Sequence, residues 1–376
     1  MLRSRLILAF FGSAALALAA CDGSVTTNTG GAGGSGGSGG SGTGNTDEGP
    51  GVLPPEAGPE AAPDGSDTTL AIRKLYLGDT DRDGSPSTSA WKKFGFDLDG
   101  KISKKESTGL CKPAEGAKPS AVYEDGEEGR DNSFGKNILP IITSLASDAS
   151  TQINDSIETG SFTIMLHIEK LGTGDNYNPI PSKLYAGGKL VDAMGMEILP
   201  KWDGTDAWPV IPELLNGGNI EDPKIKFPNA YLVKDAKSGA RTWVSGGKAD
   251  ITLNLSVAGF TLSLTIGSAL VATDIDASNA KGTNGTIAGI LDTEQLISEL
   301  AKVAGSFDPS LCPPSSTFES IAQQIRQASD IMTDGTQDPD KECNGISIGL
   351  GFDMTQVQLG SVAPAATPGE DPCMTM

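Results

Sequence analysis

The most regular pattern along the chain is an alternation of apolar and polar residues, which predicts β-strands. In residues 161–171, Phe162, Ile164, Leu166 and Ile168 occupy every second position and face one way, while Thr163, Met165, His167 and Glu169 face the other. Residues 249–275 alternate in the same way twice, with Ala258-Gly259 between the two runs as a turn, and this predicts a hairpin with one buried face. Shorter apolar runs predict further strands at residues 70–77, 224–233, 241–244, 283–291 and 345–352.

Helical spacing of apolar residues appears in three other segments. It predicts helices over residues 137–157, 293–304 and 316–332. Asp292 and Thr293 form a candidate cap region for the second helix, and Ser316 followed by Glu319 resembles a capping box at the start of the third. Because helices and strands do not alternate regularly, we predict a β-rich α+β fold, with an antiparallel β-sandwich-like body and a few packed helices.

The segment before the first predicted strand shows neither pattern. Residues 21–67 include the run GGSGGSGGSG and then become rich in Pro, Glu and Ala. Such a segment buries too little apolar surface to fold, so we predict a disordered tether. Residues 68–376 are then expected to form a single β-rich extracytoplasmic domain.

Residues 1–20 have the composition of an export signal. Arg3 and Arg5 precede an uncharged, mostly apolar run that is too short to span a bilayer comfortably. The sequence Leu18-Ala19-Ala20-Cys21 that follows resembles the lipobox of bacterial lipoproteins. This resemblance implies cleavage before Cys21, a diacylglycerol on its sulfur and a third acyl chain on the new amine. An ordinary signal peptide, with Cys21 as a plain thiol, is the alternative.

Two or more acyl chains hold a protein stably on a membrane. We expect an exported protein that is lipid-anchored to the cell envelope, and we favour the outer membrane or cell surface over the inner membrane. Asp22 favours inner-membrane retention in some bacteria, so the choice of membrane stays open. The 28 basic and 48 acidic residues, a net charge of -20, make nucleic acid a poor partner. The partners we expect are the lipid bilayer, through acylated Cys21, and a glycan or an envelope protein.

Apart from Cys21, the chain contains four cysteines, and an even number in an exported protein predicts two disulfides. Three pairings are open. We favour Cys312 with Cys343, because the segment between them reads as a helix that doubles back, and Cys111 with Cys373. Reduced, buried thiols are the alternative.

Three acidic, glycine-containing loops supply candidate metal ligands, and Ca²⁺ is the cofactor that they suggest because it takes six to eight oxygen ligands. Solvated acidic turns are the alternative. The candidate ligands are Asp79, Asp81, Asp83, Asp97, Asp99, Asp125, Asp131 and Asn132.

The first two loops partly resemble calcium-binding loops. Asp79 to Gly84 resembles the opening of an EF-hand loop, but Pro86 and Ala90 stand where an aliphatic residue and a glutamate belong. GFDLDGKISKKE matches an EF-hand from position three onward, yet has Gly95 at position one. A strand that ends in an Asp99-Gly100 turn explains the second pattern equally well.

Catalytic motifs are missing from the sequence, so we assign no catalytic residue. His167 is the only histidine, and there is no G-x-S-x-G, H-E-x-x-H or phosphate-binding loop. A surface polysaccharide hydrolase with Asp/Glu acid–base pairs is the alternative function. It would use tryptophans as a sugar platform, from the set Trp91, Trp202, Trp208 and Trp243.

Several stretches together resemble exported bacterial lipoproteins of myxobacterial type. They are the lipobox, the Gly/Ser tether, FGFDLDG, a cysteine, DNSFGKNILP and GISIGLGF. The resemblance implies a location and no activity. We therefore predict a membrane-anchored cell-envelope lipoprotein that is a non-catalytic binding or structural module, with calcium as a stabilising ion.

Overall fold

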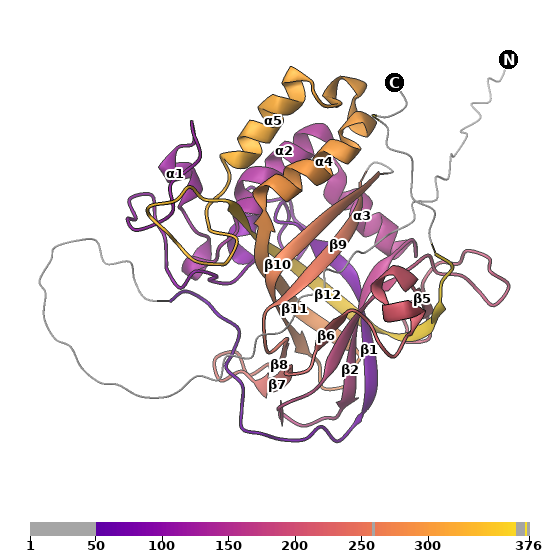
Figure 1. The fold of residues 1–376 in the computed structure, drawn as a ribbon. Helices are drawn as coiled ribbons and strands as arrows, with labels where there is room; N and C mark the ends of the chain where they lie inside the picture. Colours follow the sequence, from indigo (N-terminus) through magenta and orange to yellow (C-terminus); the bar gives the residue numbers. More distant parts are fainter. Residues whose placement is uncertain (1–49, 258–259, 366–372, 374–376) are drawn as a thin grey trace, which may run out of the picture.

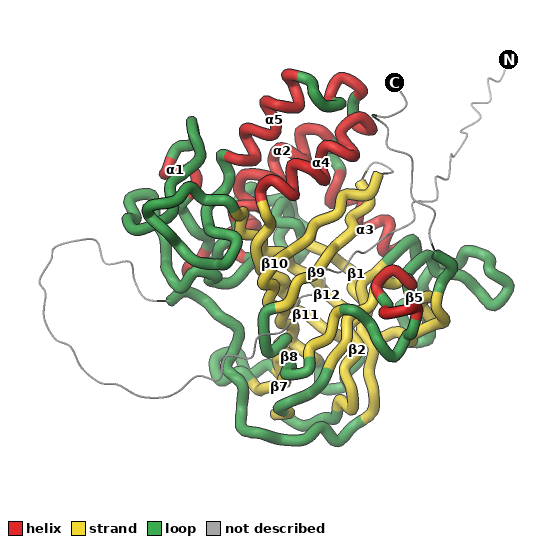
Figure 2. Tube along the Cα trace, viewed as in Figure 1, coloured by secondary structure: helices red, strands yellow, loops and turns green. Residues whose placement is uncertain are grey.

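The computed structural model describes residues 50–257, 260–365 and 373 (Figure 1). The export signal, Cys21, the Gly/Ser-rich run and the Ala258-Gly259 turn lie outside the described residues. Strands predominate over helices in the described part (Figure 2), which confirms the β-rich α+β class.

Twelve strands are present in the described part of the chain. They are β1 (Ser66–Tyr76), β2 (Thr163–Leu171), β3 (Asn176–Tyr177), β4 (Ser182–Gly187), β5 (Ala207–Val210), β6 (Ile225–Phe227), β7 (Tyr231–Lys234), β8 (Arg241–Val244), β9 (Ala249–Val257), β10 (Phe260–Ile275), β11 (Lys281–Asp292) and β12 (Gly345–Val362). The α-helices are α1 (Pro119–Val122), α2 (Leu139–Leu145), α3 (Ala149–Glu158), α4 (Thr293–Phe307) and α5 (Ser316–Arg326).

All of these strands belong to one sheet, with β12 at its centre. β12 pairs with β11 on one side and with β1 on the other, and its last residues pair in parallel with β5. From β1 the sheet continues through β2 and β4 to β6, and from β11 through β10 to β8, β7 and β3. β9 forms the predicted hairpin with β10. Every pairing except β5 with β12 is antiparallel.

The sheet bends until its two ends face each other. Trp243 of β8 donates its indole N–H to Ser182 Oγ of β4 at 3.0 Å. The Trp243 ring also meets Phe227 of β6 edge to face, with 5.6 Å between the ring centroids. The sandwich-like arrangement is thus made by two halves of one sheet, and the core lies between them.

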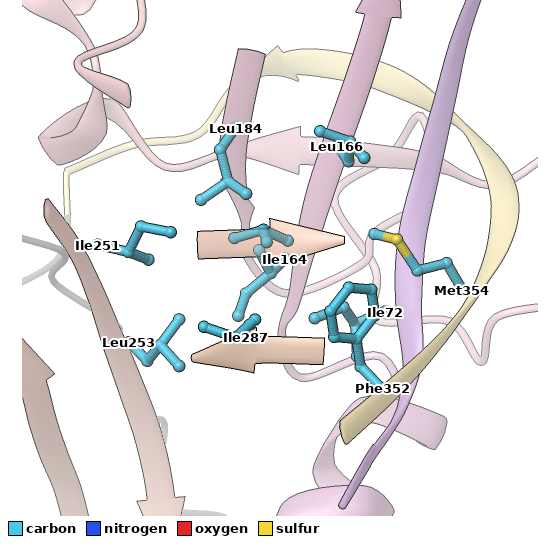
Figure 3. A pocket seen from close by; sticks show the side chains of 10 residues that line it. Ile72, Ile164, Leu166, Leu184, Ile251, Leu253, Ile287, Phe352 and Met354 are labelled. Carbon is cyan, nitrogen blue, oxygen red and sulfur yellow. The ribbon is translucent and has the colours of Figure 1, made fainter. Parts of the chain in front are cut away.

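Aliphatic side chains from both halves of the sheet fill this core (Figure 3). They enclose a fully apolar space of about the size of one water molecule. A space of this size leaves no room for a larger ligand between these side chains. Its lining comprises Ile72, Ile164, Leu166, Leu184, Ile251, Leu253, Val271, Ile287, Phe352 and Met354.

The helices cover the sheet at positions close to those predicted. α3 packs against β1 and β9, while α4 packs against β10, β11 and α5. Of the two residues in the predicted cap region, Asp292 caps α4, since its Oδ1 accepts from Gln295 N at 2.8 Å. The N-cap of α5 is Ser315, one residue before the predicted Ser316. The predicted helix at 137–157 is divided into a π-helical turn (Phe134–Ile138), α2 and α3.

Residues 50–67, which we predicted to belong to the tether, are part of the folded body. Backbone hydrogen bonds join Val52 N to Glu128 O, Ala61 N to Asn178 O and Gly65 N to Lys170 O, each at 2.9 Å. Ser66 and Asp67 already lie in β1. The segment has few apolar residues to bury, and it is ordered because loops of the body pair with its backbone groups.

The predicted cysteine pairing is wrong, although two disulfides form. They join Cys111 to Cys343 and Cys312 to Cys373. Lys112 forms a bridge with the segment before β12, with Cys343 N donating to Lys112 O at 2.9 Å, and this places Cys111 beside Cys343. Helix α5 packs beside α4 and does not return Cys312 to Cys343.

The two disulfides indicate an oxidising, extracytoplasmic compartment. Within the described residues, no helix is both long enough and apolar enough to cross a membrane.

Peptide mapping of the unreduced protein tests the pairing. We expect cross-linked peptides that contain Cys111 with Cys343 and Cys312 with Cys373. Replacing Cys111 and Cys343 together by alanine should lower the free energy of unfolding by about 2–5 kcal/mol, because a long loop is released in the unfolded chain. Urea titration measures this change. A peptide that joins Cys312 to Cys343 would contradict the structure.

Candidate metal centre

Three separate segments bring carboxylates together beside the start of β12. Asp97, Asp99 and Asp131 each place an oxygen within 4.8 Å of the others. The charges of Asp99 and Asp330 act on Asp125, and those of Asp99, Asp125 and Asp330 act on Asp131, so Asp125 and Asp330 belong to the same group. The cluster therefore combines the second and third loops predicted from sequence with a segment between α5 and β12.

The loop that carries Asp97 and Asp99 is shaped by its own carboxylates. Asp97 Oδ1 accepts from Gly100 N at 2.7 Å and from Lys101 N at 3.2 Å, and Asp99 Oδ1 accepts from Lys101 N at 2.9 Å. Asp97 Oδ2 accepts from Gly51 N at 2.5 Å, so the N-terminal segment closes over this loop. Asp97 is thereby almost fully buried, with 3% of its surface exposed.

The EF-hand frame is not realised in this loop. A four-residue 3-10 turn, Ala90–Lys93, precedes it, and the next helix is α1 at Pro119. Glu106, which would occupy the twelfth position, is exposed to solvent. The resemblance is thus confined to the Asp-x-Asp-Gly turn, because the flanking helices and the closing glutamate of an EF-hand are not in place.

The other carboxylates are held by backbone N–H groups of neighbouring segments. Asp131 Oδ2 accepts from Leu98 N at 2.6 Å, and Asp125 Oδ2 accepts from Ser103 N at 2.5 Å. Asp330 accepts from both Ser347 N, at 2.8 Å, and Ser347 Oγ, at 2.5 Å, on β12. These contacts fix the carboxylates in space but supply no neutralising charge.

Two glycines of β12 allow Phe94 and Gly95, which precede the loop with Asp97 and Asp99, to pack closely against this strand. A Cβ atom at Gly349 would collide with the backbone of Phe94 and Gly95, and one at Gly351 would collide with the Phe94 ring. Asn132 also attaches the third acidic loop to β12. Its side chain donates to Gly349 O and accepts from Gly349 N, each at 3.0 Å.

Asn132 thus has a structural role. Besides the two bonds to Gly349, it donates to Trp91 O at 3.0 Å and accepts from Gly135 N at 2.9 Å. Its amide is occupied by backbone groups, which leaves it poorly suited to bind the metal that we predicted for it.

The first acidic loop does not join the cluster. Asp81 pairs with Lys93 at 2.7 Å, and Asp83 Oδ1 accepts from Ser85 N at 2.8 Å. Asp79 accepts from Ser87 N through its backbone carbonyl at 2.8 Å. The structure therefore brings Asp97, Asp99, Asp125 and Asp131 together and leaves Asp79, Asp81 and Asp83 in a separate turn.

Burial and mutual repulsion raise the pKa values of Asp99, Asp125, Asp131 and Asp330. Burial is the main cause for Asp125, whose pKa rises to about 8, and for Asp330, whose pKa rises to about 7. The pKa of the buried Asp131 is raised well above its usual range by burial and then by the charges of Asp99, Asp125 and Asp330. Burial also raises the pKa of Asp99.

Nearby cations do not balance this charge. The half-buried Lys136 interacts with the charges of this region: burial lowers its pKa, while Glu124, Asp330 and Asp125 oppose that effect. Its ammonium group donates to Glu124 O at 2.9 Å. Two ionised carboxylates within 4.8 Å repel each other by at least about 3 kcal/mol at an effective dielectric constant of 20. Three such pairs would cost about as much as a whole domain's stability, so protons or a cation must neutralise the cluster.

The donor set fits a hard cation. The clustered ligands are carboxylate oxygens, and Ser103 Oγ, next to Asp125, is buried without a protein partner. Oxygen donors of this kind suit Ca²⁺. Zn²⁺ prefers nitrogen and sulfur ligands. The four described cysteines are in disulfides, and His167 instead contacts Thr69 Oγ1 through Nδ1 at 2.9 Å.

Sequence reasoning missed Asp330 and its neighbour Gln337. Gln337 Nε2 donates to Asp99 Oδ2 at 2.7 Å and to Asp330 O at 3.0 Å. Residues 330–342 form a fourth acidic, glycine-containing segment, so their composition was a usable signal. Nothing local indicated that this segment lies beside loops more than 190 residues earlier in the chain.

The four tryptophans do not provide a sugar platform. Trp208 and Trp243 are fully buried, and Trp91 and Trp202 are each 7% exposed. A sugar ring stacks on an exposed aromatic face, so none of these four side chains can serve the polysaccharide hydrolase considered from the sequence.

Comparisons with known protein families, with curated proteins and with solved structures find no match for this chain.

The metal-free protein should lose stability as the pH rises from about 4 to about 8. Asp125 and Asp330 titrate at about 8 and 7 in the folded state but near 4 when unfolded, so the folded state holds protons that the unfolded chain releases. The stabilisation from these two protonated carboxyl groups is complete below about pH 4. It decreases as the pH rises toward 8, by about 1.4 kcal/mol per pH unit for each proton that the folded state retains. Urea titrations in EDTA measure this slope.

Asp125→Asn is the matched variant for that measurement, and it should flatten the slope. A stability that stays constant or rises across this pH window would contradict the raised pKa values.

Proposed function

We propose that the protein is a lipoprotein of the cell envelope, anchored through Cys21, whose β-rich body is a non-catalytic binding or structural module stabilised by calcium. The observation that carries the proposal is the convergence of Asp97, Asp99 and Asp131 in a buried group. The group contains only oxygen ligands, and the neighbouring cations do not balance its negative charge. A bound Ca²⁺ would take these oxygens as ligands and neutralise that charge.

A bound cation would join segments that have little regular structure of their own. Asp97 holds the N-terminal segment at Gly51, and Asp131 holds the backbone of the acidic loop at Leu98. Asp99 connects this loop to the segment before β12 through Gln337. Neutralising these carboxylates removes the repulsion that would otherwise push the segments apart, so calcium acts here as a cross-link.

The proposed location at the cell envelope is supported by the disulfides and by the acidic character of the whole chain. Two disulfides fit an exported protein, and free calcium is plentiful outside the cytoplasm. The net charge of -20 favours cation binding and disfavours nucleic acid. The lipobox-like sequence before Cys21 supports anchoring, and the partners proposed for the body are a glycan or an envelope protein.

Calcium should raise the melting temperature of the protein relative to EDTA. A ligand that binds only the folded state at one hundred times its Kd adds about 2.7 kcal/mol of stability. Asp131→Asn should abolish the calcium-dependent shift, because Asp131 is one of the three converging carboxylates and is buried. Differential scanning calorimetry with and without millimolar Ca²⁺ measures both effects.

Asp81→Asn is the control for this experiment, since Asp81 belongs to the first acidic loop and pairs with Lys93 outside the cluster. It should retain the full shift. Equal melting temperatures in EDTA and Ca²⁺ for the unmodified protein would rule out the calcium part of the proposal.

The mature N-terminus tests the anchor. Mass spectrometry of the protein from bacterial membranes should find an acylated Cys21 at the N-terminus, and Cys21→Ser should release the chain from the membrane fraction. An N-terminal peptide with an unmodified Cys21 thiol would contradict lipid anchoring.

A further inference from the structure

A loop between β4 and β5 carries most of the exposed large apolar side chains of the described chain. In this loop, residues 191–199, Met194 is 83% exposed, Leu199 70%, Met196 64% and Ile198 39%. Among the described residues, only Leu53 and Val362 are comparable large apolar side chains elsewhere. In Figure 1 the loop projects from the body beside β5. We refer to these four residues as the apolar tip.

The loop has a defined shape, so this exposure does not come from loose packing. Val191 forms a bridge with Glu197, and Asp192 Oδ1 accepts from Met194 N at 2.8 Å and Met196 N at 2.9 Å. Lys189 and Glu197 form an ion pair of 2.7 Å at the base. The chain thus builds a small hairpin that presents apolar side chains to solvent.

The base of the loop is attached firmly to the body. Leu190 N donates to Gly160 O at 2.7 Å, at the end of α3. On the other side, Trp202 is buried against Trp208, with 5.7 Å between the ring centroids, and the backbone N–H of Trp202 donates to Asp206 Oδ2 at 2.7 Å. Substitutions at the apolar tip should therefore leave the core intact.

We infer that the apolar tip inserts into the surface of the lipid bilayer, an inference that rests on the membrane anchoring in the proposed function. The tip is a short bridged loop that projects from the body, which suits a fluid bilayer that closes around it. Met194 to Met196 carry no charge, and Ile198 to Pro200 carry none either. Burying such side chains in the bilayer interface removes apolar surface from water.

The chain before the body is long enough to allow this contact. Residues 22–49 separate Cys21 from the first described residue, and fully extended they span about 90–100 Å. The anchor therefore does not prevent any face of the body from reaching the bilayer. The net charge of -20 opposes binding to anionic headgroups, so a zwitterionic surface is the one that the tip fits.

Vesicle binding by an unacylated chain tests the tip separately from the anchor. The full mature chain with Cys21→Ser should float with phosphatidylcholine vesicles, and addition of Met194→Ser, Met196→Ser and Leu199→Ser should lower its partition coefficient at least about tenfold. The matched control replaces Leu53 and Val362 by serine and should bind as well as the parent. Circular dichroism establishes that all variants fold.

Two results would overturn the inference. One is the failure of the folded Cys21→Ser chain to bind vesicles. The other is equal binding by the triple serine variant and its parent. Self-association that the triple variant loses, in the absence of vesicle binding, would instead assign the tip to contact between copies of this chain. None of these results bears on acylation of Cys21, which the mass of the mature N-terminus tests independently.

Discussion

Strand β12 sets the position of almost every other part of the structure. It pairs with β11 and β1 at the centre of the sheet, so the two halves that enclose the core meet along it. Its first residues also hold the acidic segments, through Ser347 with Asp330 and Gly349 with Asn132. Glycine at 349 and 351 makes room for Phe94. The strand therefore joins the fold to the candidate metal centre.

The carboxylate cluster places an electrostatic requirement on this arrangement. Hydrogen bonds from the backbone of Gly51, Leu98 and Ser103 fix the acidic side chains, but those bonds do not remove the repulsion between them. The cluster lies where the N-terminal segment, two loops and the segment before β12 meet. A cation that neutralises it would stabilise several contacts at once, while the Cys111–Cys343 disulfide holds the same region covalently.

Much of the β framework was predictable, since alternation reports which face of a strand is buried. The hairpin of β9 and β10, the strand β2 and the capping of α4 by Asp292 follow from local sequence. The π-helical turn and the break between α2 and α3 were not predicted, because apolar spacing alone continues through them. Within the site, four of the eight candidate ligands converge, and Asp330 was missed because its contacts are remote in sequence.

Local sequence by itself determined the strand and helix segments, the even cysteine set and the acidic loops, because periodicity and composition act over a few residues. Tertiary structure alone decided the cysteine pairing, the ordering of residues 50–67 and which carboxylates meet. Cys111 and Cys343 form a disulfide although 232 residues separate them, and Gly51 contacts Asp97 through a single hydrogen bond. Such contacts depend on how the whole sheet bends, and that bend comes from many long-range pairings that no local pattern records.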